Sequence, residues 1–236
     1  MIEPVSSPHS LPVYAQVAER LQRDIAAGRL IDGERLPPER VMAQSLDVSV
    51  GTLRKALALL EQKSLLRRVQ GSGNYVDAAG MRDTLYAMFR LELPQGGGLP
   101  TATVLSVDVL TKPEDLPQFG TSDRATRMRR LRQLDQIEIA VEEIWLDAGA
   151  GTLTQDQVFP SLYDTYQRQL GLWISRAEDR VTLGAVPDWA NGTFHMRSGV
   201  AVGFAERYSW SQDATPVEYS RTWFDPVRAV YVQRIL

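Results

Sequence analysis

The sequence has no cysteine and only two histidines, His9 and His195, among its 236 residues. Metal sites built from thiolates or several imidazoles are therefore disfavoured, and an all-carboxylate site remains open. No apolar run approaches the ~20 residues of a membrane span, and residues 1–4 do not begin a signal peptide. We expect a cytoplasmic protein without a metal site or a cofactor.

An excess of basic residues is also missing: 26 Lys and Arg stand against 29 Asp and Glu, which gives a net charge of −3. Taken alone, this balance argues against a nucleic-acid partner. The charge is unevenly distributed, however. Residues 50–76 contain a single acidic side chain, Glu61, and five basic ones, Arg54, Lys55, Lys63, Arg67 and Arg68. Phosphate contact needs basic groups on one face only, so DNA binding stays open.

Hydrophobic spacing predicts three helices in the first third of the chain. Apolar residues at four-residue intervals, with Gly28 behind them, predict a helix over residues 13–27: Val13, Val17, Leu21 and Ile25. Pro37 and Pro38 are tolerated in a first turn and open a second, short helix. Ser49 can cap a third helix that ends near Gln62. Its predicted core face consists of Leu53, Leu57 and Leu60.

The segment after these helices favours a β-hairpin. Residues 66–76 form two short apolar runs joined through Gly71, Ser72 and Gly73. Three helices followed by a basic hairpin are a winged helix-turn-helix, a unit that recognises double-stranded DNA. We assign residues 11–77 to this domain and residues 1–10 to a flexible lead-in. The order disfavours an RNA-binding or purely structural module.

Beyond the hairpin the pattern changes to short runs rich in Val, Ile, Tyr and Trp. We expect a linker over residues 78–97 and a second domain over residues 98–236. Its predicted strands are Ala102–Leu110, Ala125–Leu134, Glu138–Leu146, Arg180–Ala185, Val202–Ser211 and Thr215–Phe224. Its predicted helices are Pro113–Phe119 and Leu162–Gln169. The composition favours an α+β fold with a mainly antiparallel sheet.

The candidate DNA contacts lie in the second helix, at the start of the third helix and in the hairpin. Guanidinium groups bond to phosphates or to guanine edges, and the first turn of a recognition helix faces the major groove. Glycines either permit a tight turn or let the backbone approach DNA. The predicted contacts are Arg40, Ser49, Thr52, Arg54, Lys55, Arg67, Arg68, Gly71, Ser72 and Gly73. The alternatives are solvated basic side chains and, for Thr52, a hydroxyl bonded to its own helix.

A candidate anion site lies in the second domain. Arg130 and Arg132 flank Leu131 and therefore point to one face of a strand, where two guanidinium groups suit a phosphate or carboxylate. Glu142 and Glu218 could accept hydrogen bonds from the same ligand. Ser161 could cap a helix or contact the anion. The alternative for Arg130 and Glu142 is a plain ion pair across the sheet.

The tryptophans favour a hydrophobic core or a dimer interface, because large aromatic side chains dominate both. Trp145, Trp173 and Trp223 remain possible walls of a ligand pocket. We assign no role to His195.

Four blocks of the N-terminal domain resemble the GntR family of bacterial transcription regulators. They are residues 12–17 (PVYAQV), 36–43 (LPPERVMA), 48–57 (VSVGTLRKAL) and 70–76 (QGSGNYV). Val50 and Pro38 stand where the family pattern has Arg and Ser.

The second domain resembles the UTRA effector domain of the HutC subgroup, whose fold is like that of chorismate lyase. The residues that carry the likeness are 130–132, 140–143, 161–163 and 216–220. The resemblance implies a homodimer that binds operator DNA, most often as a repressor, and that changes its affinity when a small molecule occupies the UTRA domain.

An enzyme with a chorismate-lyase-like pocket and an ancestral DNA-binding domain is the alternative function. Against it, the sequence shows no nucleophile–base set, phosphate-binding loop, dinucleotide fingerprint or metal constellation. The effector stays open among sugar phosphates, carboxylates such as urocanate, phosphonates and fatty acids.

Overall fold

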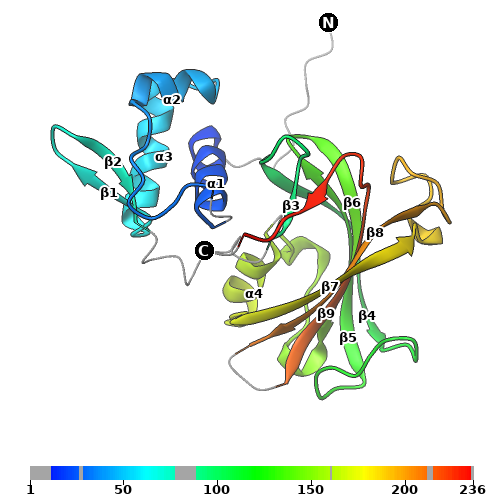
Figure 1. The fold of residues 1–236 in the computed structure, drawn as a ribbon. Helices are drawn as coiled ribbons and strands as arrows, with labels where there is room; N and C mark the ends of the chain where they lie inside the picture. Colours follow the sequence, from blue (N-terminus) through cyan, green and yellow to red (C-terminus); the bar gives the residue numbers. More distant parts are fainter. Residues whose placement is uncertain (1–11, 27–28, 78–88, 160, 212–214, 235–236) are drawn as a thin grey trace, which may run out of the picture. The chain divides into compact units, whose positions relative to one another are not determined.

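The computed structural model describes residues 12–26, 29–77, 89–159, 161–211 and 215–234. The chain divides into two compact units, one made of Met1–Arg90 and Gln233–Leu236 and the other of Leu91–Val232 (Figure 1). The predicted lead-in, the greater part of the predicted linker and Gly28 lie outside the described residues. No helix in the described part of the chain is long and apolar enough to span a membrane.

The first unit contains the predicted three helices and hairpin. Its elements are α1 (Val13–Ala26), α2 (Glu39–Ser45), α3 (Val50–Gln62), β1 (Leu66–Val69) and β2 (Gly73–Val76). Helix α2 begins two residues later than predicted, because Pro38 has ψ 137° and is the residue before the first helical turn. Strands β1 and β2 pair antiparallel, with Val69 opposite Gly73.

The core of this unit confirms the predicted face of α3. Leu53, Leu57 and Leu60 are 0, 2 and 0% exposed. They pack in one cluster with Leu21 and Ile25 of α1. Helix α1 begins at Val13 as predicted, although Val13 itself is 55% exposed, since it lies at the helix start before the buried stripe begins.

The second unit is built on a six-stranded antiparallel sheet in the order β4-β5-β6-β9-β8-β7 (Figure 1). The strands are β4 (Pro100–Thr111), β5 (Arg124–Leu134), β6 (Ile137–Asp147), β7 (Arg176–Ala185), β8 (Ala201–Trp210) and β9 (Pro216–Phe224). Helix α4 (Leu162–Leu170) ends at Gly171, whose φ of 63° lies in the left-handed region that favours glycine. Short 3₁₀ helices lie at Ala148–Ala150, Gln155–Gln157 and Asp188–Ala190. The six predicted strands and this helix are confirmed.

Two predictions in this unit were wrong. Residues 113–119 form a turn and an extended segment rather than a helix. Phe119 is buried against Tyr219, and its carbonyl accepts a hydrogen bond of 2.6 Å from Lys112 Nζ instead of from a helical N–H. The end of the predicted linker contains a short strand, β3 (Leu91–Glu92), which pairs with β10 (Val230–Tyr231). Both strands are only two residues long, too short to give a periodic signal.

Candidate functional site

The start of α3 is organised by two hydroxyl groups. Ser49 precedes the helix, and its Oγ accepts a hydrogen bond of 3.0 Å from the Thr52 backbone N–H. The same Oγ lies 2.8 Å from Thr52 Oγ1. Ser49 thus caps the helix, as predicted, and Thr52 bonds to its own helix start. Both residues lie at the N-terminal end of α3, where the helix dipole is positive.

The basic side chains predicted to contact DNA are all exposed, but they differ in the contacts they make within the protein. Arg54 donates from Nε to Glu39 Oε2 at 2.6 Å. Lys55 Nζ lies 6.0 Å from the centre of the Tyr14 ring. Within the described ranges, Arg40 is exposed and has no hydrogen bond or ion pair.

The two glycines of the hairpin lie at positions where the backbone has a positive φ. Gly71 and Gly73 have φ values of +74° and +138°. Ser72 Oγ lies 2.7 Å from the Tyr75 hydroxyl. The Arg67 guanidinium is 5.7 Å from the centre of the Tyr75 ring, and Arg68 Nε donates to Asn74 at 3.3 Å. Neighbouring strand residues point to opposite faces, so Arg67 and Arg68 extend the positive charge over both sides of the hairpin.

One basic residue of this region, Arg35, was not predicted from the sequence. It forms an isolated bridge with Tyr75, and its guanidinium donates to the Ser72 carbonyl. A Cβ added to Gly73 would lie 3.3 Å from Arg35 Nε. Arg35 therefore braces the tip of the hairpin. The one sequence signal for Arg35 was its position two residues after the turn at Asp32-Gly33.

In the second unit, the predicted anion-site arginines lie together and are buried. Register places Arg130 of β5 opposite Glu142 of β6. Arg130 donates to Glu142 Oε2 from Nε at 3.1 Å and from Nη2 at 2.7 Å, and Arg132 Nε lies 3.4 Å from Glu142 Oε1. Burial opposes the charged form of Glu142, but the charges of Arg132 and Arg130 outweigh it and lower the pKa of this carboxyl. The alternative of a cross-sheet ion pair is thus realised, in a buried form.

Glu218 lies on the same face of the sheet. Glu142 is opposite Thr222 of β9, and Glu218 is four residues before Thr222, an even spacing. Its carboxylate accepts hydrogen bonds from Tyr166 Oη at 2.5 Å and from Ser209 Oγ at 2.7 Å. Burial raises the pKa of Glu218. Because Tyr166 belongs to α4, this helix covers the face that carries both glutamates.

Further polar residues of this face were missed by the sequence analysis. Arg207 of β8 donates to Asp179 of β7 through Nε at 2.5 Å and Nη2 at 2.6 Å. The Tyr163 hydroxyl lies 3.2 Å from Ser209 Oγ, and burial raises its pKa to about 12. Tyr231 donates to Asp179. These partners come from strands and a helix far apart in the chain, so tertiary contacts rather than local spacing bring them together.

Ser161 precedes α4 without capping it through its side chain. Its carbonyl accepts a hydrogen bond of 3.0 Å from Thr165 Oγ1. Tyr163, two residues later, contacts Ser209. Ser161 therefore lies at the beginning of the helix that covers the polar face, and the residue is half-buried.

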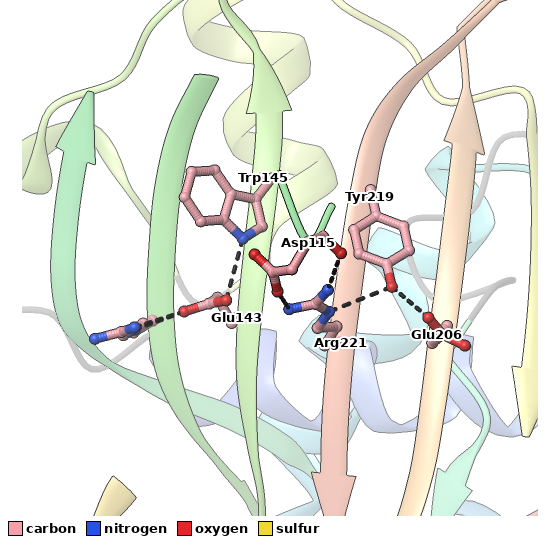
Figure 2. Close-up of polar contacts among 7 residues, drawn as sticks. Asp115, Glu143, Trp145, Glu206, Tyr219 and Arg221 are labelled. Atoms are coloured by element: carbon pink, nitrogen blue, oxygen red, sulfur yellow. Dashed lines mark hydrogen bonds and ion pairs between the residues drawn. The ribbon is translucent and has the colours of Figure 1, made fainter. Parts of the chain in front are cut away.

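The opposite face of the sheet is aromatic and also carries ion pairs. Register places Trp145 opposite Tyr219, and Figure 2 shows the Trp145 indole N–H directed at Glu143, at 3.2 Å. Tyr219 donates to Glu206, and Arg221 pairs with Asp115 at 2.9 Å (Figure 2).

The tryptophans on this opposite face decide between the two predicted roles. Trp145 packs with Phe119, and Trp223 packs with Phe194. Trp145 and Trp223 are therefore core residues on the far side of the sheet from Arg130, which favours the core role over a pocket wall for both. Trp173 is half-buried, and no ring contact places it in either role.

Across the residues that the structure describes, no three His, Asp or Glu side chains are grouped closely enough to hold a metal ion. The two candidate sites are an exposed basic surface in one unit and a buried polar cluster in the other.

Comparisons with known proteins match both units. The model of bacterial regulatory proteins of the gntR family matches residues 13–76, and the UTRA domain model matches residues 95–229. The HTH-type transcriptional regulator SmoD of Agrobacterium fabrum is 54% identical over 96% of this chain and 97% of its own length. The HTH-type transcriptional repressor NagR of Bacillus subtilis is 25% identical over 94% of each chain.

A solved structure supports the fold. The crystal structure of YydK, a possible transcriptional regulator from Bacillus subtilis, has a TM-score of 0.54 at 21% identity and covers 96% of this chain and 100% of YydK. The curated relatives carry the names of regulators and give the enzyme alternative no support. The chain belongs to the GntR family, and it is a DNA-binding transcription regulator that combines a winged helix-turn-helix domain with a UTRA domain.

Proposed function

We propose that this regulator is a repressor of the HutC subgroup, acting as a cytoplasmic homodimer that leaves its operator when an anionic metabolite binds the UTRA domain. The proposed DNA contacts are Arg40, Ser49, Thr52, Arg54, Lys55, Arg67, Arg68, Gly71, Ser72 and Gly73. The proposed effector contacts are Arg130, Arg132, Glu142, Ser161 and Glu218.

The observation that carries the effector site is the pair of buried arginines around one carboxylate. Arg130 and Arg132 are 4 and 6% exposed, and both approach Glu142. Burying guanidinium groups is costly unless acidic groups lie beside them. The Arg132 contact of 3.4 Å is longer than the ~2.7–2.9 Å of a strong charged hydrogen bond. Two guanidinium groups beside one carboxylate are the donor set that a phosphate or carboxylate ligand needs.

Linkage explains how binding at this site would act on DNA. An effector changes operator affinity only if it prefers the form of the regulator that binds DNA less well. The proposed homodimer follows from the DNA side, since helix-turn-helix dimers contact two half-sites about one helical turn apart. A repressor name on a relative, NagR, favours repression over activation.

In vitro selection from a randomised duplex library tests the DNA half of the proposal. We expect an enriched inverted repeat, and light scattering should find two chains on each duplex. Failure to enrich any sequence, or one chain per duplex, would contradict it.

A thermal-shift screen with inorganic phosphate, glucose 6-phosphate and urocanate tests the effector half of the proposal. At least one anion should stabilise the wild type and not Arg132→Ala.

A further inference from the structure

An acidic side chain lies within the proposed DNA surface, at Glu39. It is the first residue of α2, and its carboxylate accepts the hydrogen bond of 2.6 Å from Arg54 Nε on α3. The Glu39 side chain is 25% exposed and the Arg54 side chain 65%. The contact thus joins the two helices of the helix-turn-helix at the surface.

This carboxylate is unfavourable for DNA binding by charge alone. DNA phosphates repel it, and binding to any duplex rests largely on neutralising phosphates. Stability does not account for it either, because exposed ion pairs contribute little to folding. Neither DNA affinity nor folding stability therefore explains why an acidic side chain occupies this position.

The geometry of the contact between Glu39 and Arg54 suggests a role in orienting the guanidinium. Glu39 binds the Nε of Arg54, which leaves the two terminal amino groups of the guanidinium for another partner. Guanine O6 and N7 are read by such a pair of donors. An exposed arginine otherwise has many rotamers, and restricting them before binding reduces the entropy lost on recognition.

We propose that Glu39 is a positioning residue that fixes the Arg54 guanidinium for base recognition, and that it increases sequence specificity while lowering affinity for DNA in general. The inference rests on the proposed contact between Arg54 and a base. It makes Glu39 specificity-determining although its carboxylate touches no DNA.

The test compares Glu39→Gln with the wild type on two duplexes, the sequence selected by the wild type and a scrambled sequence of equal length. Fluorescence anisotropy at fixed salt gives both dissociation constants. We expect Glu39→Gln to bind the scrambled duplex two- to five-fold more tightly, since a negative charge is lost, and to lose three- to ten-fold of the preference for the selected duplex. Weaker binding to both duplexes with an unchanged preference between them would overturn the inference.

Glu61→Gln is the matched control, because it removes one exposed acidic charge from the last turn of α3. It should leave the preference between the two duplexes unchanged. In the Arg54→Ala background, Glu39→Gln should no longer alter the preference, since the group it positions is gone.

The Arg54→Ala variant separates the two levels of the proposal. If Arg54→Ala itself keeps the full sequence preference, the proposed base contact of Arg54 is wrong. If Arg54→Ala loses preference while Glu39→Gln retains it, the base contact stands and the positioning role of Glu39 is overturned.

Discussion

Glu142 accepts two hydrogen bonds from Arg130, at 3.1 Å from Nε and 2.7 Å from Nη2, on a face of the sheet that α4 covers. The register of β5 and β6 sets this pair opposite each other. Arg132 approaches the second oxygen of the same carboxylate. One glutamate therefore organises both arginines of the proposed effector site, and its charge state affects stability as well as binding.

Glu142→Gln should make the protein less stable, and the loss should depend on pH. The pKa of Glu142 is lowered in the folded state, so its contribution is fully present above the unfolded value of 4.5 and disappears as the pH falls through the folded value. Removing one member of a buried ion pair costs about 3–5 kcal/mol. Urea unfolding at pH 7 and at pH 4 and below measures the difference, which should shrink on acidification.

The exposed Glu114, in the same unit, supplies the control. Glu114→Gln should stay close to the wild type at every pH. A Glu142→Gln difference that is equally large at acidic and neutral pH would show that lost packing, rather than lost charge, causes it.

Replacing Ser49 should separate its two roles. Ser49→Ala removes the side-chain cap of α3 and should lower the free energy of unfolding by about 1 kcal/mol. Ser49→Asp keeps a capping oxygen and should remain near wild-type stability, yet bind DNA more weakly because it adds a negative charge beside the phosphates. Thermal unfolding and anisotropy measure the two effects. Equal DNA affinity for Ser49→Asp and the wild type would place Ser49 away from the DNA.

The tip of the hairpin should not tolerate a side chain at Gly73. Its φ is +138°, and an added Cβ would crowd Arg35, so Gly73→Ala should cost about 1–3 kcal/mol of local strain. If the hairpin contacts DNA, operator affinity should fall several-fold as well. Gly51→Ala is the contrasting change, because an added Cβ meets only Ser49 Oγ at 3.8 Å, and it should raise stability by about 0.5–1 kcal/mol. Intact affinity in a destabilised Gly73→Ala protein would exclude the hairpin from the DNA contact.

The features that could be predicted from the sequence are those that depend on the spacing of residues within one helix or one strand. Leu53, Leu57 and Leu60 mark the buried face of α3 because one helix presents them together. The flanking of Leu131 by Arg130 and Arg132 likewise predicts their common face from strand alternation alone.

What could not be predicted depends on contacts between distant segments. Arg207 and Asp179 meet because β8 and β7 pair in one register, and nothing near either residue indicates it. The expected helix over residues 113–119 failed because long-range contacts, Phe119 on Tyr219 and Asp115 with Arg221, outweigh local propensity. Arg35 was missed because its partner Ser72 lies 37 residues away.

Operator binding by wild type and Arg132→Ala, with and without the anion that gives the largest thermal shift, tests the central claim most directly. The anion should weaken wild-type binding to the selected duplex by about 5–150-fold, the usual range for coupling between two sites. Arg132→Ala should bind the duplex as tightly as the wild type and stay bound when the anion is added. Release of both proteins by the same anion concentration, or no anion that releases the wild type, would contradict the account.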